Sequence, residues 1–406
     1  MAAPENAPDG AALALWTLMR PGYLAMLFLA GWAANVLVLA RGRVDYGAAL
    51  GLAREELPTA TQLLALALGG ALILASTHAG VAAQGPSPLG LGCVLLLYAA
   101  ATMALLGQLP PPLARRAPPA RAAFARALRR CFWPDLGKEV PFAQVLVADG
   151  LTSLARALFD IALGSCAAVG AAGGGLGSTL ALATGTQYHP AEQALLGDAL
   201  ERCGRSPVPY FAWAMPFLVR ARQCWVSSRN APDVLSRHLH LVNLAKYVSA
   251  LPIVCLAYLR AQAHDSEGAE ELEVFGALAG VVNTVFCYLW DLAMDWGLLH
   301  PAPPMSGRFG LRPVLLLCEG GGFYYLAIAV DAVARACWSL RWCPEAVALG
   351  GFGLGSLQQA VEVARRCLWS VLRVEWQCAR SGGGQRSEGK GQRSEGKAVA
   401  ESVVPA

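Results

Sequence analysis

The sequence predicts an all-α fold, a polytopic bundle of about nine helices that cross a membrane. Its 406 residues are 55% hydrophobic and only 15% charged, whereas soluble domains contain about 25% charged residues. Mean hydropathy is +0.44, and apolar runs recur from near the N-terminus to residue 376. Lys and Arg also gather in alternate connecting segments, as in membrane proteins. A single membrane domain therefore accounts for most of the chain.

The apolar runs give the order of the elements. The start of the chain lacks the basic segment of a cleaved signal peptide, so residues 1–17 are expected to form a lumenal tail ahead of a retained first span. Runs of about 20 apolar residues are long enough to cross a bilayer. They cover residues 18–40, 61–83, 88–107, 142–171, 207–227, 240–260, 272–297, 314–340 and 346–376. The first three, with the basic loop after them, make up an N-terminal part, 18–140.

The distribution of positive charge predicts the orientation. The segments on one side hold 21 Lys and Arg residues, and those on the other side hold 5. The second side also includes residues 263–273, with five acidic residues and no Lys or Arg. Because positive loops stay in the cytosol, we expect a cytosolic C-terminus and a lumenal or outer N-terminus.

Two segments outside the spans have distinctive compositions. The loop from Pro110 to Lys138 is rich in Pro and Arg. Its part AFARALRR would suit a basic amphipathic helix on anionic headgroups, although an ordinary positive cytosolic loop is the preferred interpretation. The tail from residue 381 to 406 repeats GQRSEGK and has few apolar residues. It is expected to be disordered and cytosolic.

Charged residues inside the predicted spans carry the argument about function. Six are basic and seven are acidic: Arg156, Lys246, Arg335, Arg365, Arg366 and Arg373, with Asp149, Asp160, Asp291, Asp295, Asp331, Glu362 and Glu375. Three pairs are four residues apart and could neutralise each other on one helix face: Arg156 with Asp160, Asp331 with Arg335, and Glu362 with Arg366. Lys246 has no acidic residue within a helical turn, and Arg365 points about 100° away from Arg366. These two are expected to face other helices or water.

Such residues suit a pathway for a small oxyanion. An ionisable group at bilayer depth costs about 2.5 to 3.5 kcal/mol on insertion scales and usually faces a cavity or a partner charge. Arg offers a planar fork for phosphate oxygens, and Lys adds a point charge. A structural ion-pair network and a membrane enzyme remain alternatives. The enzyme would use Asp291 and Asp295 as a DxxxD motif that holds magnesium and a diphosphate, as in membrane prenyltransferases, but the sequence has no second DxxxD motif.

Six segments, in order along residues 141–380, resemble the EXS domain. They are FAQVLVADGLTSL (142–154), PFLVRARQC (216–224), HLVNLAKY (240–247), WDLAMDWGLL (290–299), YYLAIAVDAVARACW (324–338) and EVARRCLWSVLRVE (362–375). The run at 29–46 is similar to the first helix of the short members. EXS domains occur in phosphate exporters of the retrovirus-receptor type and in short Golgi relatives. The short relatives are implicated in phosphate recycling and in retention of glycosyltransferases.

The resemblance implies transport of inorganic phosphate across an endomembrane, that of the Golgi first and the plasma membrane as the alternative. It implies no enzymatic activity, cofactor, metal or nucleic-acid partner. A Golgi scaffold that retains glycosyltransferases is the competing non-enzyme hypothesis. The GALAG run at 276–280 permits close helix packing, with an internal contact preferred over the seam of a homodimer. The residues implied to line the anion path are Asp149, Arg220, Lys246, Tyr247, Asp291, Asp295, Arg335, Trp338, Arg365 and Arg366.

The sequence departs from the exporters at several points. Thr152 stands where they commonly have Asn, and WVSSRN after Cys224 lacks their paired arginines. No SPX domain precedes the membrane part, so regulation by inositol pyrophosphates is expected to be absent. The twelve cysteines show no CxxC pair or zinc spacing, and they say little about the redox compartment.

Overall fold

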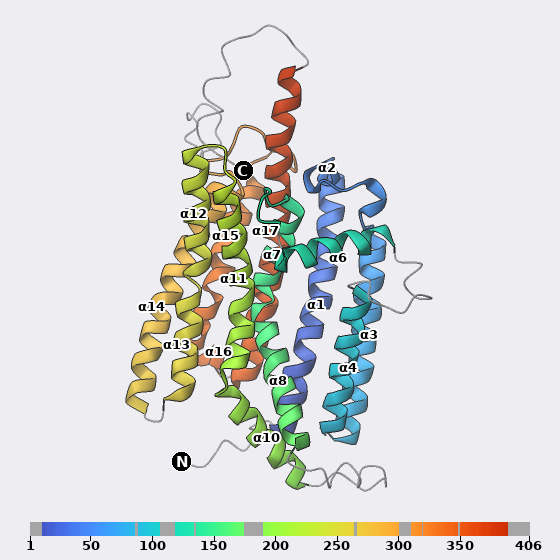
Figure 1. The fold of residues 1–406 in the computed structure, drawn as a ribbon, viewed down its shortest axis with the longest axis vertical. Helices are drawn as coiled ribbons and strands as arrows, with labels where there is room; N and C mark the ends of the chain where they lie inside the picture. The colour runs from blue at the N-terminus through green and yellow to red at the C-terminus, as the bar shows by residue number, and fades with distance from the viewer. Residues whose placement is uncertain are drawn as a thin grey trace.

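The computed structural model describes residues 10–85, 88–105, 118–133, 135–173, 190–263, 266–299, 310–318, 320–347 and 350–388. Every regular element within these ranges is a helix. Most of the helices run side by side along the long axis of the molecule (Figure 1). The all-α membrane bundle predicted from the sequence is therefore confirmed.

The N-terminal part begins with α1 (Gly10–Arg41), followed by α2 (Tyr46–Leu50), η1 (Arg54–Glu56), α3 (Ala60–Gln84) and α4 (Pro88–Leu105). Helix α1 continues through Pro21 because Tyr98 of α4 repairs the broken hydrogen bond. The backbone N–H of Gly22 donates to the Tyr98 hydroxyl over 3.0 Å, and that hydroxyl donates to the carbonyl of Leu18. Gly22 has no Cβ, which leaves room for the hydroxyl beside the helix. A proline kink whose freed groups are bonded in this way costs little.

The next helices are α6 (Pro119–Phe132), α7 (Phe142–Ser153), α8 (Ala155–Gly173), α10 (Pro190–Gly204) and α11 (Pro207–Arg229). Helices α7 and α8 meet at a bend of 58°. A disulfide joins Cys166 of α8 to Cys203 of α10. Helix α6 lies across the bundle rather than along it (Figure 1), with Ala123, Ala125 and Cys131 buried. Residues 119–132 of the basic segment are thus helical.

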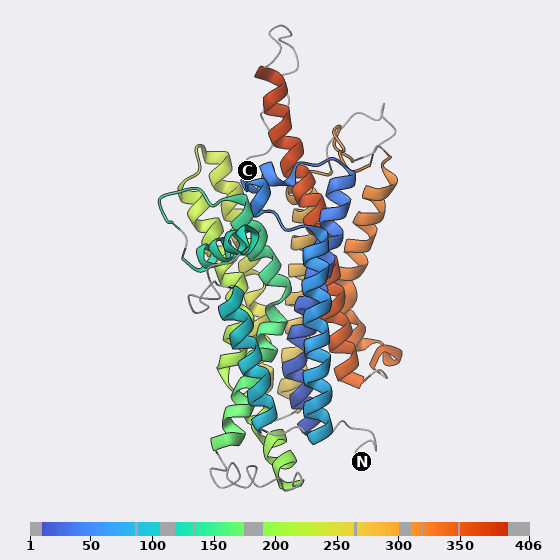
Figure 2. The same cartoon turned by 90° about the vertical axis from the view of Figure 1, so that its right-hand side faces the viewer.

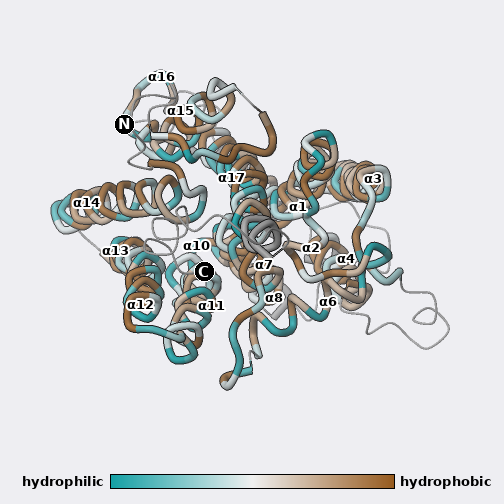
Figure 3. Tube along the Cα trace, turned by 90° about the horizontal axis from the view of Figure 1, so that it is seen from above, coloured by the Kyte–Doolittle hydropathy of each residue, from teal (hydrophilic) through white to brown (hydrophobic). Residues whose placement is uncertain are grey.

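The C-terminal half contains α12 (Val234–Val248), α13 (Leu251–Gln262), α14 (Ser266–Trp290), a π-helical turn (Asp291–Asp295), α15 (Gly322–Ala336), η4 (Cys337–Trp342), α16 (Pro344–Val347) and α17 (Gly350–Glu388). Helix α17 packs against α1, α7 and α15, so it lies between the N-terminal helices and the α12–α15 group (Figure 3). The charged residues in its middle part, such as Arg365 and Glu375, are therefore buried among other helices.

Each of the nine predicted spans contains a helix or consecutive helices, although the eighth, 314–340, is helical only from Gly322. By length and hydropathy, however, five stretches of the described residues qualify as membrane spans, or up to six if the bent pair α7 and α8 counts as one. Helices α11 and α17 do not qualify, since each carries several charged residues. Helix α4 is a shorter apolar helix by the same test. The number nine is therefore not confirmed.

The two ends of the bundle differ. One end carries α2, the turn between α11 and α12 and the C-terminal part of α17, and we call it the basic end (Figures 1 and 2). The other carries the first turns of α1, α10, the last turn of α13 and the first turn of α14, and we call it the disulfide end because the disulfide between α8 and α10 lies there. The described segments that the charge count placed on one side thus do lie together.

Both expected tails are shorter than predicted. Helix α1 begins at Gly10, and Ala11, Ala14 and Leu15 are buried in a cluster with Leu196 of α10, so the tail predicted for 1–17 is helical from residue 10. Helix α17 continues to Glu388, so residues 381–388 are helical rather than disordered. The remaining parts of both tails, 1–9 and 389–406, lie outside the described residues.

Candidate functional site

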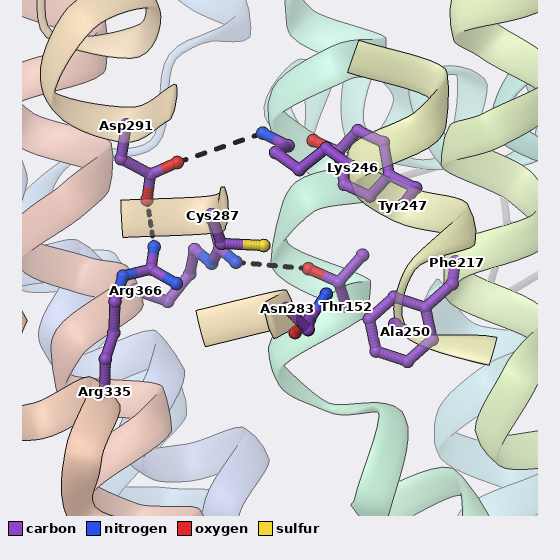
Figure 4. Close-up of a pocket in the computed structure, with 10 residues that line it drawn as sticks. All are labelled: Thr152, Phe217, Lys246, Tyr247, Ala250, Asn283, Cys287, Asp291, Arg335 and Arg366. Carbon is purple, nitrogen blue, oxygen red and sulfur yellow. Dashed lines mark hydrogen bonds and ion pairs between the residues drawn. The ribbon is translucent and has the colours of Figure 1, made fainter. Parts of the chain in front are cut away.

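A small polar cavity lies within the bundle, where α7, α11, α12, α14, α15 and α17 meet. Its volume is about 50 Å³, room for a few water molecules or one small ion. Figure 4 shows Lys246, Arg335 and Arg366 around it, with Asp291 between Lys246 and Arg335. The lining residues are Thr152, Phe217, Lys246, Tyr247, Ala250, Asn283, Cys287, Asp291, Arg335 and Arg366.

Lys246 is held by carboxylates from another helix. It lies in the last turn of α12 and is 4% exposed. Its Nζ is 3.4 Å from Asp295 Oδ2 and 3.8 Å from Asp291 Oδ1. The ammonium also lies 5.4 Å from the centre of the Trp290 ring and 4.6 Å from that of Tyr247. The sequence expectation that Lys246 looks across the bundle is confirmed.

The chain changes its helical form at the two aspartates. The N–H of Trp296 donates to the carbonyl of Asp291 over 2.8 Å, which closes a π-helical turn over Asp291–Asp295. Such turns are rare and occur frequently at functional sites. Gly297 follows at a φ of 60°, a left-handed conformation that favours glycine. The turn therefore ends α14 just where its carboxylates meet the cations.

Arg335 and Arg365 are neutralised by acidic neighbours. Arg335 Nε donates to Asp331 Oδ2 over 2.7 Å, and its Nη2 donates to Asp291. Arg365 makes a bidentate pair with Glu362, at 2.8 and 2.7 Å, and donates to Asp331 Oδ1 over 3.0 Å. The predicted pair of Asp331 with Arg335 is confirmed. Bidentate pairs of this kind fix geometry as well as charge.

Arg366 is the least neutralised cation that lines the cavity. Its hydrogen bonds go to uncharged hydroxyls of α7, over 2.7 Å to Ser153 and 3.3 Å to Thr152. Glu362, the expected partner four residues earlier, does form an ion pair with it, but at 4.0 Å and without a hydrogen bond. The hydrogen bonds of Glu362 with an arginine go to Arg365 instead, as described above. Arg366 is therefore less compensated than Lys246 or Arg335, and its guanidinium suits an oxyanion.

A second buried network adjoins the cavity through Tyr247. Arg220 Nε donates to Asp149 Oδ1 over 2.7 Å, and its Nη2 donates to the Tyr247 hydroxyl over 3.1 Å. That hydroxyl donates to Asp149 over 2.6 Å. Arg220 is 3% exposed, so it belongs to the interior and not, as the charge count assumed, to a connecting loop. The network fixes Tyr247 in the cavity wall.

The ten residues implied by the resemblance thus fall into three groups. Five line the cavity: Lys246, Tyr247, Asp291, Arg335 and Arg366. Four contact a lining residue without lining the cavity themselves: Asp149, Arg220, Asp295 and Arg365. Trp338 alone makes up the third group: it lies on η4, and its indole N–H donates to Thr284 over 3.0 Å. Their roles in binding stay predictions.

Four lining residues were not predicted from the sequence: Phe217, Ala250, Asn283 and Cys287. A signal existed for two of them. Asn283, Cys287 and Asp291 are spaced by four residues, so they share one face of α14. Phe217 and Ala250 are apolar residues in apolar runs, and nothing in the sequence distinguishes them from residues that face lipid.

The predicted pair of Arg156 with Asp160 is not formed. Asp160 binds Arg20 of α1 through both oxygens, at 3.0 and 2.9 Å, and also accepts from Gln359 over 3.3 Å. Arg20 was counted with the outer segments, but its side chain is 11% exposed. Glu375 likewise pairs over 2.7 Å with Arg312, which was counted as a loop cation. In both cases the carboxylate pairs with an arginine from a distant segment, because helix packing brings that arginine within reach.

The central cluster combines unlike charges with a small positive excess. Among the described residues it contains six basic side chains and five acidic ones. Nine of them are joined in a chain of ion pairs, and the pair of Arg220 with Asp149 adjoins that chain through the Tyr247 hydroxyl. They are Arg220, Lys246, Arg335, Arg365, Arg366 and Arg373, with Asp149, Asp291, Asp295, Asp331 and Glu362. Asp291 and Asp295 lie against these cations, which compete for the carboxylate oxygens that magnesium would use. The arrangement favours an anion over a metal ion as the ligand.

Comparison with known proteins gives a consistent picture. A model of the EXS family matches residues 15–379. The chain is 24% identical over 267 residues to Protein ERD1 homolog 1 of Schizosaccharomyces pombe, which is 64% of each chain. It is 35% identical over 176 residues to Phosphate transporter PHO1 of Arabidopsis thaliana, 41% of this chain and 20% of that protein. It is 27% identical over 167 residues to Solute carrier family 53 member 1 of Homo sapiens, 40% of this chain and 23% of that protein.

The chain therefore spans less than two thirds of the first of these relatives and about a fifth of the second. The family match, in contrast, runs from the first turns of α1 to residue 379 in α17 and includes the residues around the cavity. On that coverage, this chain is a member of the EXS family.

Proposed function

We propose that this protein transports inorganic phosphate across the Golgi membrane, and that the cavity around Lys246, Arg335 and Arg366 is the site through which phosphate passes. The observation that carries the proposal is the set of contacts that the Arg366 side chain makes. It lines the cavity, and its hydrogen bonds go to the hydroxyls of Ser153 and Thr152. Its charge is available to an incoming anion.

The charge balance of the cluster fits this substrate. Phosphate carries between one and two negative charges near neutral pH, and the cluster has about one positive charge in excess. A phosphate that bound Arg366 and displaced one carboxylate from Lys246 would leave the buried charges close to balance. Binding would thus be favourable without being so tight that release is blocked, which transport requires.

Two of the compared proteins support the substrate class, since one is named a phosphate transporter and another a solute carrier. The Golgi location rests on the resemblance to the short members of the family. For the orientation, two independent features agree. Positive segments favour the cytosol for the basic end, and the Cys166–Cys203 disulfide favours an oxidising compartment for the other end. We propose that the disulfide end faces the lumen.

The test is phosphate flux in proteoliposomes that contain the purified protein. The wild type should move radiolabelled phosphate, and Lys246→Met should lower the initial rate by about tenfold or more, since a charge-assisted contact is worth about 1.5 to 3 kcal/mol. Lys138→Met is the matched control, because the Lys138 side chain is 79% exposed and pairs only at the surface with Asp135. A wild type without phosphate flux, or a Lys246→Met protein with normal flux, would contradict the proposal.

A further inference from the structure

Arg156 lies one helical turn beyond the cavity. Thr152 lines the cavity, and Arg156 follows it by four residues, across the bend between α7 and α8, in the direction of the disulfide end. On α11, which runs the opposite way, Trp213 precedes the lining residue Phe217 by four residues. The guanidinium of Arg156 lies 4.6 Å from the centre of the Trp213 ring. Both side chains thus belong to the layer just outside the cavity.

Arg156 has no carboxylate partner among the ion pairs of the described residues. Its nearest candidate in the sequence, Asp160, is bound by Arg20 and Gln359. Two aromatic rings contact Arg156 instead: its guanidinium lies 4.2 Å from the centre of the Phe159 ring and also beside the Trp213 ring. Aromatic rings attract a cation without neutralising it.

Arg156 is exposed although it lies on an inner face of α8. Asp160, four residues on in the same helix, is 1% exposed and contacts Arg20 of α1. Residues four apart lie on the same side of a helix. Arg156 therefore shares a helix face with a residue that packs against another helix, and part of its side chain is accessible there.

We propose that Arg156 is a second subsite for the transported oxyanion, between the cavity and the disulfide end. This proposal rests on the proposed function and adds a second binding position for the transported anion. Contact with the rings uses the faces of the guanidinium, so N–H groups at its edge are left for phosphate oxygens. An anion that leaves Arg366 toward the disulfide end meets Arg156 about one turn later, and an anion that enters from that end meets it first. Sites in series allow an ion to move without a single deep energy well.

The experiment compares two replacements of Arg156. Arg156→Met keeps an unbranched apolar stem against Phe159 and Trp213 but removes the charge, whereas Arg156→Lys keeps the charge. Neither leaves an acid unpaired, because Asp160 retains Arg20. Arg205→Met is the matched control, since Arg205 is an exposed arginine near the same end that pairs with Glu201. Arg156→Gln serves as a second uncharged variant if the methionine variant is poorly folded.

The readout is the phosphate concentration that gives half-maximal initial flux. It is measured from each face, in proteoliposomes sorted by whether a C-terminal tag is accessible outside. From the disulfide-end face, Arg156→Met should raise this concentration about tenfold, the loss of about one charge-assisted contact. From the basic-end face it should change by less than about threefold, and Arg156→Lys and Arg205→Met should stay within about threefold of the wild type on both faces.

Each contrary outcome has a distinct meaning. Equal effects on both faces, no effect of Arg156→Met, or an Arg156→Lys protein as impaired as Arg156→Met would overturn the subsite while leaving phosphate transport intact. A wild type that carries no phosphate would instead overturn the proposed function itself, and it would be recognised before any variant is compared.

Discussion

Lys246 and Asp295 lie 3.4 Å apart, from Nζ to Oδ2, although 49 residues separate them in the chain. Both are almost fully buried, and Asp295 is also 3.5 Å from Arg373 Nε. Asp295 is therefore shared between a lysine that lines the cavity and an arginine of α17 that does not. A substrate anion that draws Lys246 away would leave Asp295 with one of its two cations, so the carboxylate would stay partly compensated.

The first prediction concerns this pair. Lys246→Met should destabilise the folded protein by about 3 kcal/mol, because removal of one partner leaves a buried charge poorly compensated. Adding Asp295→Asn should restore part of that stability while phosphate flux stays low, since the substrate contact is still missing. Thermal unfolding in detergent and flux in proteoliposomes measure the two effects. A double variant that regains both would show that Lys246 acts only on stability.

The second prediction separates two adjacent arginines. Arg365→Gln leaves Glu362 and Asp331 without their shared partner and should lower stability by about 3 to 5 kcal/mol. Arg366→Gln removes a residue bound to two hydroxyls, so its stability loss should be about 1 kcal/mol while flux falls about tenfold or more. Unfolding and flux of both variants are compared. Equal stability losses would argue against the assignment of Arg366 as the available cation.

The third prediction tests the DxxxD interpretation. Asp295→Asn keeps size and hydrogen bonding but removes the charge that Lys246 and Arg373 share. For an anion pathway, the change should alter the rate of phosphate flux by severalfold with or without magnesium. For a diphosphate enzyme, it should abolish magnesium-dependent binding of a lipid diphosphate. Detection of that binding in the wild type, its loss in Asp295→Asn and absence of phosphate flux from both would refute the transporter.

The fourth prediction concerns orientation. If the disulfide end faces the lumen, a glycosylation acceptor inserted in residues 266–273 should be modified in cells, and one inserted in 119–132 should not. Cys166 and Cys203 should resist alkylation until a reductant is added. Gel mobility and mass spectrometry provide the measurements. Modification of the 119–132 acceptor, with free thiols at 166 and 203, would reverse the orientation.

The class of fold and the kind of site follow from the sequence. A chain with 15% charged residues and recurrent apolar runs has to bury its backbone in membrane helices, and each predicted run contains a helix in the structure. Charged residues inside such runs were expected to find partners or a cavity, and nine of the ten implied site residues do form or contact one cavity. Spacing also identified Asp331 with Arg335, because neighbours on one helix face meet whatever the rest of the fold does.

Which charges meet across helices depends on the tertiary structure. Spacing predicted a pair of Arg156 with Asp160, but α1 packs against α8 and brings Arg20 closer to Asp160. Spacing also predicted the pair of Glu362 with Arg366, which forms only at 4.0 Å because the bidentate pair of Glu362 is with Arg365. The proposals assign phosphate to the two arginines, Arg156 and Arg366, whose predicted carboxylate partner binds another arginine more closely. The physical reason is that an ion pair across helices depends on how whole helices pack, and local spacing in the sequence carries no record of that packing.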